Sequence, residues 1–492
     1  MTSIRSTARR ARAPRPAADL AARRRGDSAP QLSADLSARQ RASREQLIAG
    51  LAVAAIVGLG AILAPLAMAI GLIALATLVY LGALVYRLTA FWLSLRNPEM
   101  VVVTDEDARS IPDELLPIYT VLVPAYHEPS VIGALIARLS ELEYPVDRLD
   151  IRLLLEQDDE ETIAAAVDAR PGRQFTIVRV PHSEPKTKPK ACNYGLRDAR
   201  GEYVTIYDAE DRPEPLQLRR AVVAFGRLGS SVACLQAKLS YYNADQNLLT
   251  SWFAIEYAMW FSFLLPGLVA QRGPLPLGGT SNHFRGEVLQ AAGGWDPYNV
   301  TEDADLGIRL ARRGYQTRVL ESTTFEEANS DVINWVKQRS RWYKGYLQTW
   351  LVHTRHPRKL LRELGWRGFI GFNLFVAGTP LLSLMNPIFW ILTALWFLIH
   401  PPVILALFPS WLYYLSMMVM IAGNVSLFYS WLISARMAGS RKLVFAALLV
   451  PVYWVLMSIA VIKAAVQLIS APSFWEKTVH GLDTTPAPGT DT

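Results

Sequence analysis

Three clusters of acidic residues stand directly after short apolar runs in the middle of this 492-residue sequence. In order, the pairs of run and cluster are YTVLVPAY (119–126) with Glu128, IRLLL (151–155) with Glu156-Gln157-Asp158-Asp159, and YVTIY (203–207) with Asp208-Ala209-Glu210-Asp211. Carboxylates one residue apart can face the same side, so the third cluster suits a divalent cation such as Mg²⁺ or Mn²⁺. Each cluster alone can also be a solvated turn or a helix N-cap, and this alternative is strongest for the second.

Basic side chains lie between the second and third clusters, in the run EPKTKPKACN (184–193). Lys186 and Lys188 fit a solvated basic loop, whereas Lys190 opens a helical stretch beside Asn193 and is the preferred phosphate contact. A lysine and a divalent cation together would neutralise a departing diphosphate.

The apolar runs predict the elements that hold these side chains. Four runs read as strands buried on both faces, 119–126, 151–155, 175–180 and 203–207, and helical stretches at 130–142, 160–169 and 215–228 separate them. This alternation predicts an α/β domain with a mostly parallel sheet and a ligand site at the carboxyl ends of its strands. No Gly-x-Gly-x-x-Gly follows the first strand, which disfavours an NAD-type protein.

Long uncharged segments flank this domain and indicate a membrane protein. Residues 46–86 contain no Asp, Glu, Lys or Arg and read as two transmembrane helices that meet near Pro65. Residues 368–435 and 443–462 are also uncharged. Four crossings fit there by length, but they would place Arg436, Arg441 and Lys442 outside. The preferred alternative has crossings only at 386–400 and 411–434, with 368–384 and 443–470 in the interface or buried.

The predicted layout follows from these segments. Residues 1–45 form an Arg-rich cytoplasmic tail, 46–96 two transmembrane helices, 97–364 a cytoplasmic domain, 365–470 transmembrane and interface helices, and 471–492 a cytoplasmic tail. Residues 1–46 hold eleven Arg and four acidic residues, which accounts for the whole net charge of +7. The remainder is neutral, so a nucleic-acid partner is not expected. Two cysteines exclude a disulfide framework.

Two further motifs complete a pattern. Thr301-Glu302-Asp303 and Gln338-Arg339-Ser340-Arg341-Trp342 follow the acidic clusters in order. Together the four motifs resemble the membrane-embedded, processive family-2 glycosyltransferases, which include bacterial cellulose, curdlan and hyaluronan synthases. The runs GGTSNHFR (278–285) and GGWDPYNVTEDADLGIRLARRGY (293–315) are similar to those of bacterial exopolysaccharide synthases.

The resemblance implies a nucleotide-sugar-binding domain of GT-A type and a role for each motif. Glu128 and either Glu156 or Asp158 would hold the uridine of a UDP-sugar, and Lys190 its phosphates. Asp208 and Glu210 match the metal motif, and whether Glu210 or Asp211 binds the Mg²⁺ or Mn²⁺ stays open.

Acceptor and catalytic roles follow in the same way. Asp303, next to Glu302, matches the general base that deprotonates the acceptor hydroxyl and inverts the anomeric carbon. Helical spacing places Gln338, Arg341 and Trp342 on one face. The resemblance gives Arg341 to the diphosphate and Trp342 to the acceptor sugar, with Gln338, Thr280 and Asn282 as further acceptor contacts.

The C-terminal run SFWEKTVHG (473–481) has two readings. Its Trp475, Lys477 and Thr478 resemble a mobile segment that closes over the nucleotide in processive relatives. The same residues suit an interfacial Trp/Lys anchor.

The implied protein is a multi-pass enzyme of the bacterial inner membrane with its catalytic domain and both termini in the cytoplasm. It would polymerise a UDP-hexose, UDP-glucose being preferred, into a β-linked exopolysaccharide and move the growing chain through its own helices. Export or regulatory proteins would be separate partners. The alternatives are a non-processive enzyme that transfers one sugar to a lipid-linked acceptor, and a non-catalytic transport or scaffold subunit.

Overall fold

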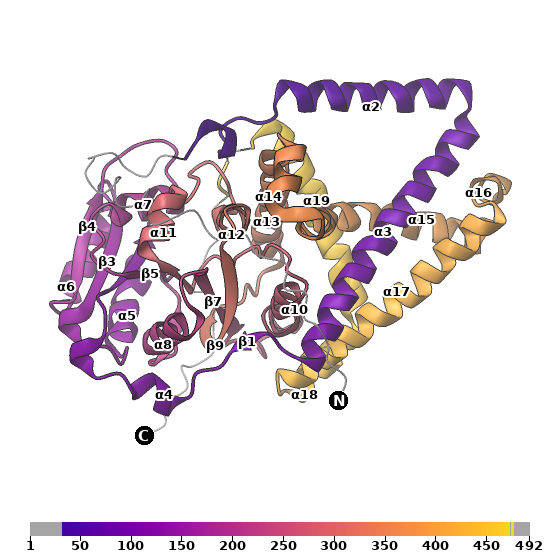
Figure 1. Cartoon of the computed structure of the whole chain (residues 1–492). Coiled ribbons are helices and arrows are strands. Elements are labelled where there is room, and N and C mark those ends of the chain that lie inside the picture. Colours follow the sequence, from indigo (N-terminus) through magenta and orange to yellow (C-terminus); the bar gives the residue numbers. More distant parts are fainter. Residues whose placement is uncertain (1–31, 473, 477–492) are drawn as a thin grey trace, which may run out of the picture.

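A computed structural model describes residues 32–472 and 474–476. The predicted tail up to residue 31 and the residues Lys477 and Thr478 lie outside this part of the chain. Figure 1 shows a sheet domain on the left and a group of long helices that extends from it to the right.

The sheet is mixed but mostly parallel, with strand order β1-β9-β7-β8-β5-β2-β3-β4, and β6 pairs with β9. The strands are β1 (Met100–Val101), β2 (Tyr119–Ala125), β3 (Leu149–Glu156), β4 (Phe175–Val180), β5 (Tyr203–Ile206), β6 (Arg212–Pro213), β7 (Val232–Tyr241), β8 (Asn282–Arg285) and β9 (Gln316–Glu326). β8 runs antiparallel to β5 and β7, and β6 runs antiparallel to β9. The predicted α/β class and the four predicted strands are confirmed.

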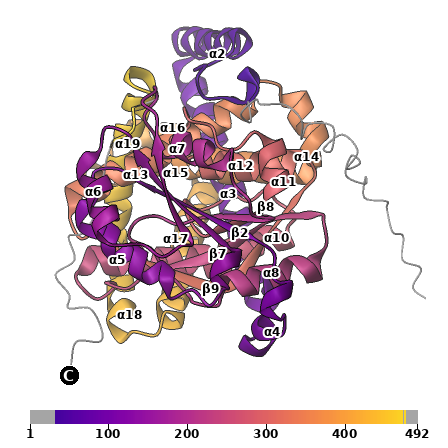
Figure 2. The ribbon, with the colours of Figure 1, turned by 90° about the vertical axis from the view of Figure 1, so that its left-hand side faces the viewer.

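Helices cover both faces of this sheet, as Figure 2 shows. On one face α5 (Pro129–Ser140), α6 (Glu160–Asp168) and α8 (Gln217–Leu228) enclose a core of buried aliphatic and aromatic side chains. On the other face α7 (Lys188–Leu196), α11 (Gly286–Ala292) and α12 (Glu302–Arg312) enclose a second core. α7 approaches the sheet closely at Gly195, where a Cβ atom would lie 2.5 Å from the side chain of Leu154. Because β2, β3 and β5 are parallel, their carboxyl ends lie together at one edge of the sheet.

Six helices of the described chain are long and apolar enough to cross a membrane. They are α2 (Arg44–Leu63), α3 (Pro65–Arg96), residues 248–270, residues 357–399, α17 (Ser410–Met437) and α19 (Val450–Ser470). The segment 248–270 comprises α9 (Leu248–Met259), a π-helical turn (Trp260–Leu264) and α10 (Leu265–Ala270). Its apolar window is 56% buried, so it packs largely against protein, and the sequence analysis did not predict it as a helix of this group.

The apolar helices differ in how they meet the sheet domain. In Figure 1, α2, α3, α15 (Gly378–Ile399) and α17 extend away from the sheet, whereas α19 runs along the boundary beside α13 (Val332–His353). The short α16 (Pro402–Leu407) joins α15 to α17. α14 (Pro357–Phe372) precedes α15 and is itself broken at Gly365 (φ 69°). By length and composition α19 is itself one of the six helices that could cross a membrane. The number of crossings and their orientation stay predictions.

Candidate active site

One cavity of about 700 Å³ joins the strand ends to the apolar helices. Its wall includes acidic residues from four places in the chain: Glu156 at the end of β3, Asp208 and Glu210 after β5, Glu302 and Asp303 at the start of α12, and Glu326 at the end of β9. Parallel strands bring their carboxyl ends to one edge, which is why residues so far apart in sequence meet.

Glu302 and Asp303 occupy the first turn of α12, where a carboxylate also interacts favourably with the helix dipole. The Asp303 Oδ1 atom accepts a hydrogen bond from the Ala304 N–H at 2.7 Å. Burial raises the pKa of Asp303 to about 6, even though Lys188 and Arg341 lie near enough to oppose the shift. Burial and the charge of Asp303 together raise the pKa of Glu302 to about 8. The two buried carboxyls therefore hold a proton between them up to a higher pH than exposed carboxyls do.

The turn after β5 presents two of its three carboxylates to the cavity. Asp208 and Glu210 line the cavity, whereas Asp211 is buried beneath the turn and is not part of the wall. The Asp211 Oδ2 atom accepts hydrogen bonds from the Asp208 N–H at 2.7 Å and from the Thr280 hydroxyl. Asp211 therefore closes the turn that aims its two neighbours. Of Glu210 and Asp211, the two alternatives for the second metal ligand, Glu210 is the one that lines the cavity.

Glu326 is a further carboxylate beside this turn that motif reasoning did not find. Burial raises its pKa well above the ordinary value, and so do the charges of Asp211, Glu210 and Asp208. No group of three His, Cys, Asp or Glu side chains at metal-binding separations occurs among the described residues. Two carboxylates suffice when phosphate oxygens and water complete the shell of Mg²⁺ or Mn²⁺. Asp208 and Glu210 fit that requirement.

The three lysines of 184–193 have different environments. Lys188 lines the cavity, pairs with Asp208 and donates a hydrogen bond to the Gly279 carbonyl at 2.8 Å. The Nζ atom of Lys190 instead lies 3.0 and 2.9 Å from the two carboxylate oxygens of Glu156, and Lys190 is not part of the cavity wall. The structure thus presents Lys188 to Asp208 and Glu302 in the cavity, whereas the sequence analysis preferred Lys190.

The expected uridine side of the cavity is formed by the ends of β2 and β3. Glu128 and Glu156 line the cavity, whereas Asp158 lies outside its wall and pairs with Lys186, 2.5 Å away. Asp159 caps α6 by accepting a hydrogen bond from the Thr162 N–H at 3.3 Å. Of the two alternatives Glu156 and Asp158, the structure therefore brings Glu156 to the site.

The run GGTSN (278–282) passes beside Asp303 at Gly279. The Thr280 hydroxyl donates to the Ile206 carbonyl at 3.0 Å and also bonds Asp211, so it supports the turn although Thr280 lines the cavity. Asn282 is 1% exposed, donates to the Gly278 carbonyl at 2.6 Å and is not part of the wall. Thr280 thus lines the cavity while it supports the turn, whereas Asn282 lies behind the wall, and an acceptor contact for either residue stays a prediction.

α13 presents the Gln-x-x-Arg-Trp motif as its spacing predicts, because Gln338, Arg341 and Trp342 all line the cavity. Trp342 packs beside Phe253 and Tyr257, with ring centroids 5.7 and 6.3 Å away. The guanidinium of Arg341 lies 4.4 Å from the ring centroid of Trp475. The described part of the run SFWEKTVHG thus reaches the cavity.

Comparison with known proteins identifies the domain. Residues 117–345 match the model of the family described as glycosyltransferase like family 2. They form a family-2 glycosyltransferase domain. The fold also resembles a solved mannosyltransferase, PcManGT from Pyrobaculum calidifontis in complex with GDP-Man and Mn²⁺, with a TM-score of 0.50 and 19% identity over 81% of this chain and 99% of that one. The predicted GT-A fold is therefore confirmed.

Curated relatives of the glycosyltransferase domain have several activities in their names. A probable glycosyltransferase YdaM of Bacillus subtilis is 27% identical over 47% of this chain and 55% of its own length. A beta-monoglucosyldiacylglycerol synthase of Synechocystis is 28% identical over 53% of each chain. Glucomannan 4-beta-mannosyltransferase 2 of Arabidopsis thaliana is 28% identical over 48% of this chain and 46% of its own. The match spans about half the length of each relative.

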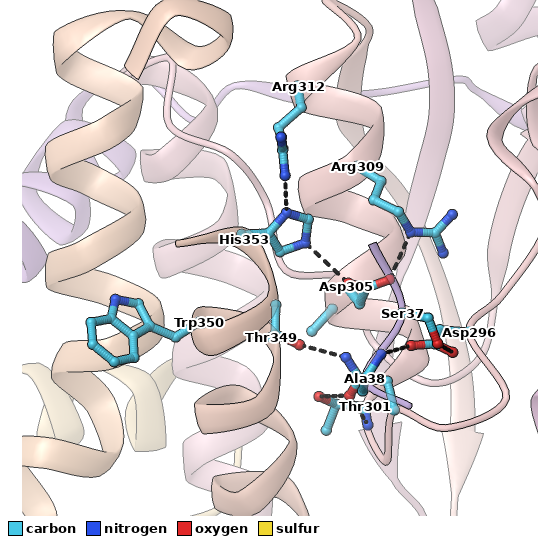
Figure 3. A network of polar contacts seen from close by, with 12 residues as sticks. Ser37, Ala38, Asp296, Thr301, Asp305, Arg309, Arg312, Thr349, Trp350 and His353 are labelled. Carbon is cyan, nitrogen blue, oxygen red and sulfur yellow. Dashed lines mark hydrogen bonds and ion pairs between the residues drawn. The ribbon is translucent and has the colours of Figure 1, made fainter. Parts of the chain in front are cut away.

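A buried polar network holds α12 of the glycosyltransferase domain against α13 (Figure 3). Asp305 accepts hydrogen bonds from Arg309 Nε at 2.7 Å and His353 Nε2 at 3.0 Å, and Arg312 Nη1 lies 2.8 Å from His353 Nδ1. With Nε2 protonated and Nδ1 accepting, His353 serves both partners in its neutral form. This network fixes α12 at Asp305, two residues after Asp303. Sequence reasoning missed it because His353 is 48 residues from Asp305.

The loop before α12 is held by the N-terminal segment as well. The Asp296 carboxylate accepts hydrogen bonds from the Ser37 hydroxyl at 2.9 Å and the Ala38 N–H at 2.5 Å, as Figure 3 shows. Gln348 of α13 accepts from the Val300 N–H at 3.2 Å and donates to the Pro472 carbonyl at 2.8 Å. The segments before α2 and after α19 therefore both brace the glycosyltransferase domain.

Gly279 leaves room between the base and the lysine. A Cβ atom there would lie 3.4 Å from Asp303 Oδ2 and 3.9 Å from Lys188 Nζ, without a closer contact. Gly279→Ala should therefore place a methyl group in the reaction space and lower kcat/KM about tenfold or more, with little change in the unfolding temperature. Gly133→Ala is the matched control, because nothing lies within 4 Å of that Cβ position. Equal kinetics for the two variants would contradict a reacting centre beside Gly279.

Proposed function

We propose that this protein transfers hexose from a nucleotide-sugar donor, UDP-glucose being the preferred one, to an acceptor hydroxyl with inversion, and polymerises a β-linked exopolysaccharide that leaves through the cavity between its helices. The observation that supports this most is the continuity of the cavity. It joins Asp303 and Trp342 to α3, α15 and α17 without interruption.

In the proposed reaction Asp303 removes the proton of the acceptor hydroxyl as that oxygen bonds to the anomeric carbon. The bond from this carbon to the diphosphate oxygen breaks, and the nucleoside diphosphate leaves from the opposite face. Lys188 and Arg341 neutralise the charge on the leaving group. A Mg²⁺ or Mn²⁺ bound by Asp208 and Glu210 would supply further neutralisation, and the Mn²⁺ named with PcManGT supports a metal requirement here.

The wall of the cavity beyond Trp342 suits a sugar chain. Aromatic rings there include Trp390, Trp431 and Trp454, and amide groups come from Asn386 and Asn424. Indole faces stack on pyranose rings while amides bond hydroxyls, and neither contact requires one fixed register. A chain that advances one sugar at a time needs this tolerance.

A second candidate function is transfer of one sugar to a lipid acceptor. The far part of the cavity is apolar, with Phe397, Leu405 and Phe408 in its wall, which favours a hydrocarbon chain. The name of the Synechocystis relative, a glycolipid synthase, supports the same idea.

The deciding experiment uses purified full-length protein in nanodiscs with radiolabelled UDP-glucose, other UDP-sugars and GDP-mannose, each with Mg²⁺ or Mn²⁺. UDP release with a labelled product of high molecular weight, both absent in Asp303→Asn, would support polymerisation and identify the donor. A lipid-extractable product of one sugar would establish the second candidate instead. Absence of nucleotide release with every donor would contradict both.

The pH dependence of the reaction follows from Asp303. Only its deprotonated form can accept the proton, and burial raises its pKa to about 6. We therefore expect kcat/KM to rise about tenfold per pH unit below pH 6 and to level off above it. For an aspartate with an ordinary pKa, this rise in kcat/KM would end near pH 4. A rate that does not change between pH 5 and 7.5, in buffers of constant ionic strength, would exclude Asp303 as the base.

A further inference from the structure

Arg87 is the one arginine that α3 contributes to the wall of the cavity. It lies nine residues before the end of this helix, about 14 Å along its axis. The guanidinium donates a hydrogen bond to the Thr379 hydroxyl and lies 5.4 Å from the ring centroid of Phe375. Its Nε atom is buried and has no hydrogen-bond partner among the described residues.

The nearby carboxylate on α9 is already neutralised. Glu256 receives hydrogen bonds from Arg339 Nη1 at 3.0 Å, from Arg339 Nη2 at 2.5 Å and from the Tyr453 hydroxyl at 2.6 Å. In the described chain, no carboxylate lies within ion-pair distance of Arg87. Two positive charges, on Arg87 and Arg339, are balanced here by the one negative charge of Glu256. This part of the cavity therefore carries one excess positive charge.

A charged side chain within an apolar helix is costly and marks a functional pathway by default. Snorkelling toward water would give Arg87 an ordinary structural role. The side chain instead lines the cavity, with its Nε atom buried beside Thr379 of α15. An anionic ligand in the cavity would supply the charge that this guanidinium lacks.

The surroundings of Arg87 change along α15. Thr379, Ser383 and Asn386 line the cavity at spacings of four and three residues, hence on one face of the helix. Further along, the wall becomes apolar at Trp396 and Phe397. α16 adds Ile404 and Leu405, so the far part of the cavity is shaped for hydrocarbon.

We propose that Arg87 is the phosphate contact of a lipid-binding subsite, with the lipid chain in the apolar part of the cavity along α15, α16 and α17. A phosphate oxygen would pair with the guanidinium in the fork geometry that arginine favours. A donor diphosphate is the less suitable occupant, because Lys188 and Arg341 already stand beside the catalytic carboxylates. This subsite rests on the second candidate function, transfer to a lipid acceptor, because a lipid chain there would fill the space through which a polymer would leave.

The test measures binding of dodecyl phosphate to the purified full-length protein in a neutral detergent, with no donor sugar present. We expect Arg87→Gln to weaken this binding about tenfold or more, and Arg87→Lys to retain most of it. Arg96→Gln is the matched control on the same helix, since Arg96 is exposed, packs over Trp92 and is not part of the cavity wall. Thermal unfolding of each variant establishes that it is folded.

Two further probes separate a lipid from free phosphate. Butyl phosphate and inorganic phosphate should bind about tenfold or more weakly than dodecyl phosphate if the apolar wall holds the chain. Equal binding of all three would overturn the lipid part of the proposal, and equal binding to Arg87→Gln and the native protein would overturn the subsite. Because no sugar transfer is measured, these results are independent of the Asp303→Asn experiment.

Discussion

Replacing Asp303 with asparagine is expected to lower kcat by about 10²–10⁴-fold, the usual contribution of a general base. Asparagine keeps the size of the side chain and can still accept the Ala304 N–H bond, but it cannot take a proton from the acceptor hydroxyl. Donor binding should change little, because Lys188 and Arg341 remain. The measurement is nucleotide release under saturating donor, together with the Kd for UDP.

Stability provides an independent check of the same variant. The pKa of Asp303 is raised by burial, so the folded state holds this proton more tightly than the unfolded chain does. Its charged form therefore costs stability that grows as pH rises from about 4 to about 6. Above pH 6, Asp303→Asn should unfold at the same or a higher temperature than the native protein. Asp147→Asn, whose carboxylate is 69% exposed, is the control. Retention of more than a tenth of kcat by Asp303→Asn would exclude a base at this position.

Replacing Lys188 with methionine is expected to lower kcat/KM about 10²–10³-fold, as removal of one preorganised charge from an active site typically does. Lys188 pairs with Asp208 and faces Glu302, so its loss leaves Arg341 as the remaining fixed cation for these carboxylates and a departing diphosphate. The metal requirement should become steeper, because added Mg²⁺ or Mn²⁺ partly replaces the missing charge. Nucleotide release measured against metal concentration tests both expectations.

Lys190→Met is the matched comparison, two residues along the same helix. Glu156 is 4% exposed, and it loses its ion-pair partner in this variant. Breaking a buried pair costs about 3–5 kcal/mol of folding free energy, so the unfolding temperature should fall. The folded fraction should keep kcat within about tenfold of native. A large loss of kcat at an unchanged unfolding temperature would instead support the phosphate role that the sequence suggests for Lys190.

The sequence alone determined the class of the glycosyltransferase domain and the order of its catalytic motifs. Strands buried on both faces are continuous apolar runs, and an acidic residue directly after such a run must lie at the ligand edge of a parallel sheet. Both facts are local, which explains why Glu128, Glu156 and Asp208 could be predicted to line one site, whereas Asp303 was assigned from the family resemblance. The spacing of Gln338, Arg341 and Trp342 likewise sets one helical face without knowledge of what it meets.

Only the tertiary structure decided which side chains enter the cavity. Residues two apart on a helix point about 200° away from each other, so Lys188 and Lys190 cannot both face it, and the packing of α7 on the sheet selects Lys188. Long-range strand pairing brings Glu326 of β9 to the turn after β5. The tertiary fold also ties Thr280 to the turn after β5 and places Asn282 behind the wall, and the packing of α3 against α15 leaves Arg87 facing the cavity. These outcomes depend on contacts between residues tens to hundreds of positions apart, which no local pattern encodes.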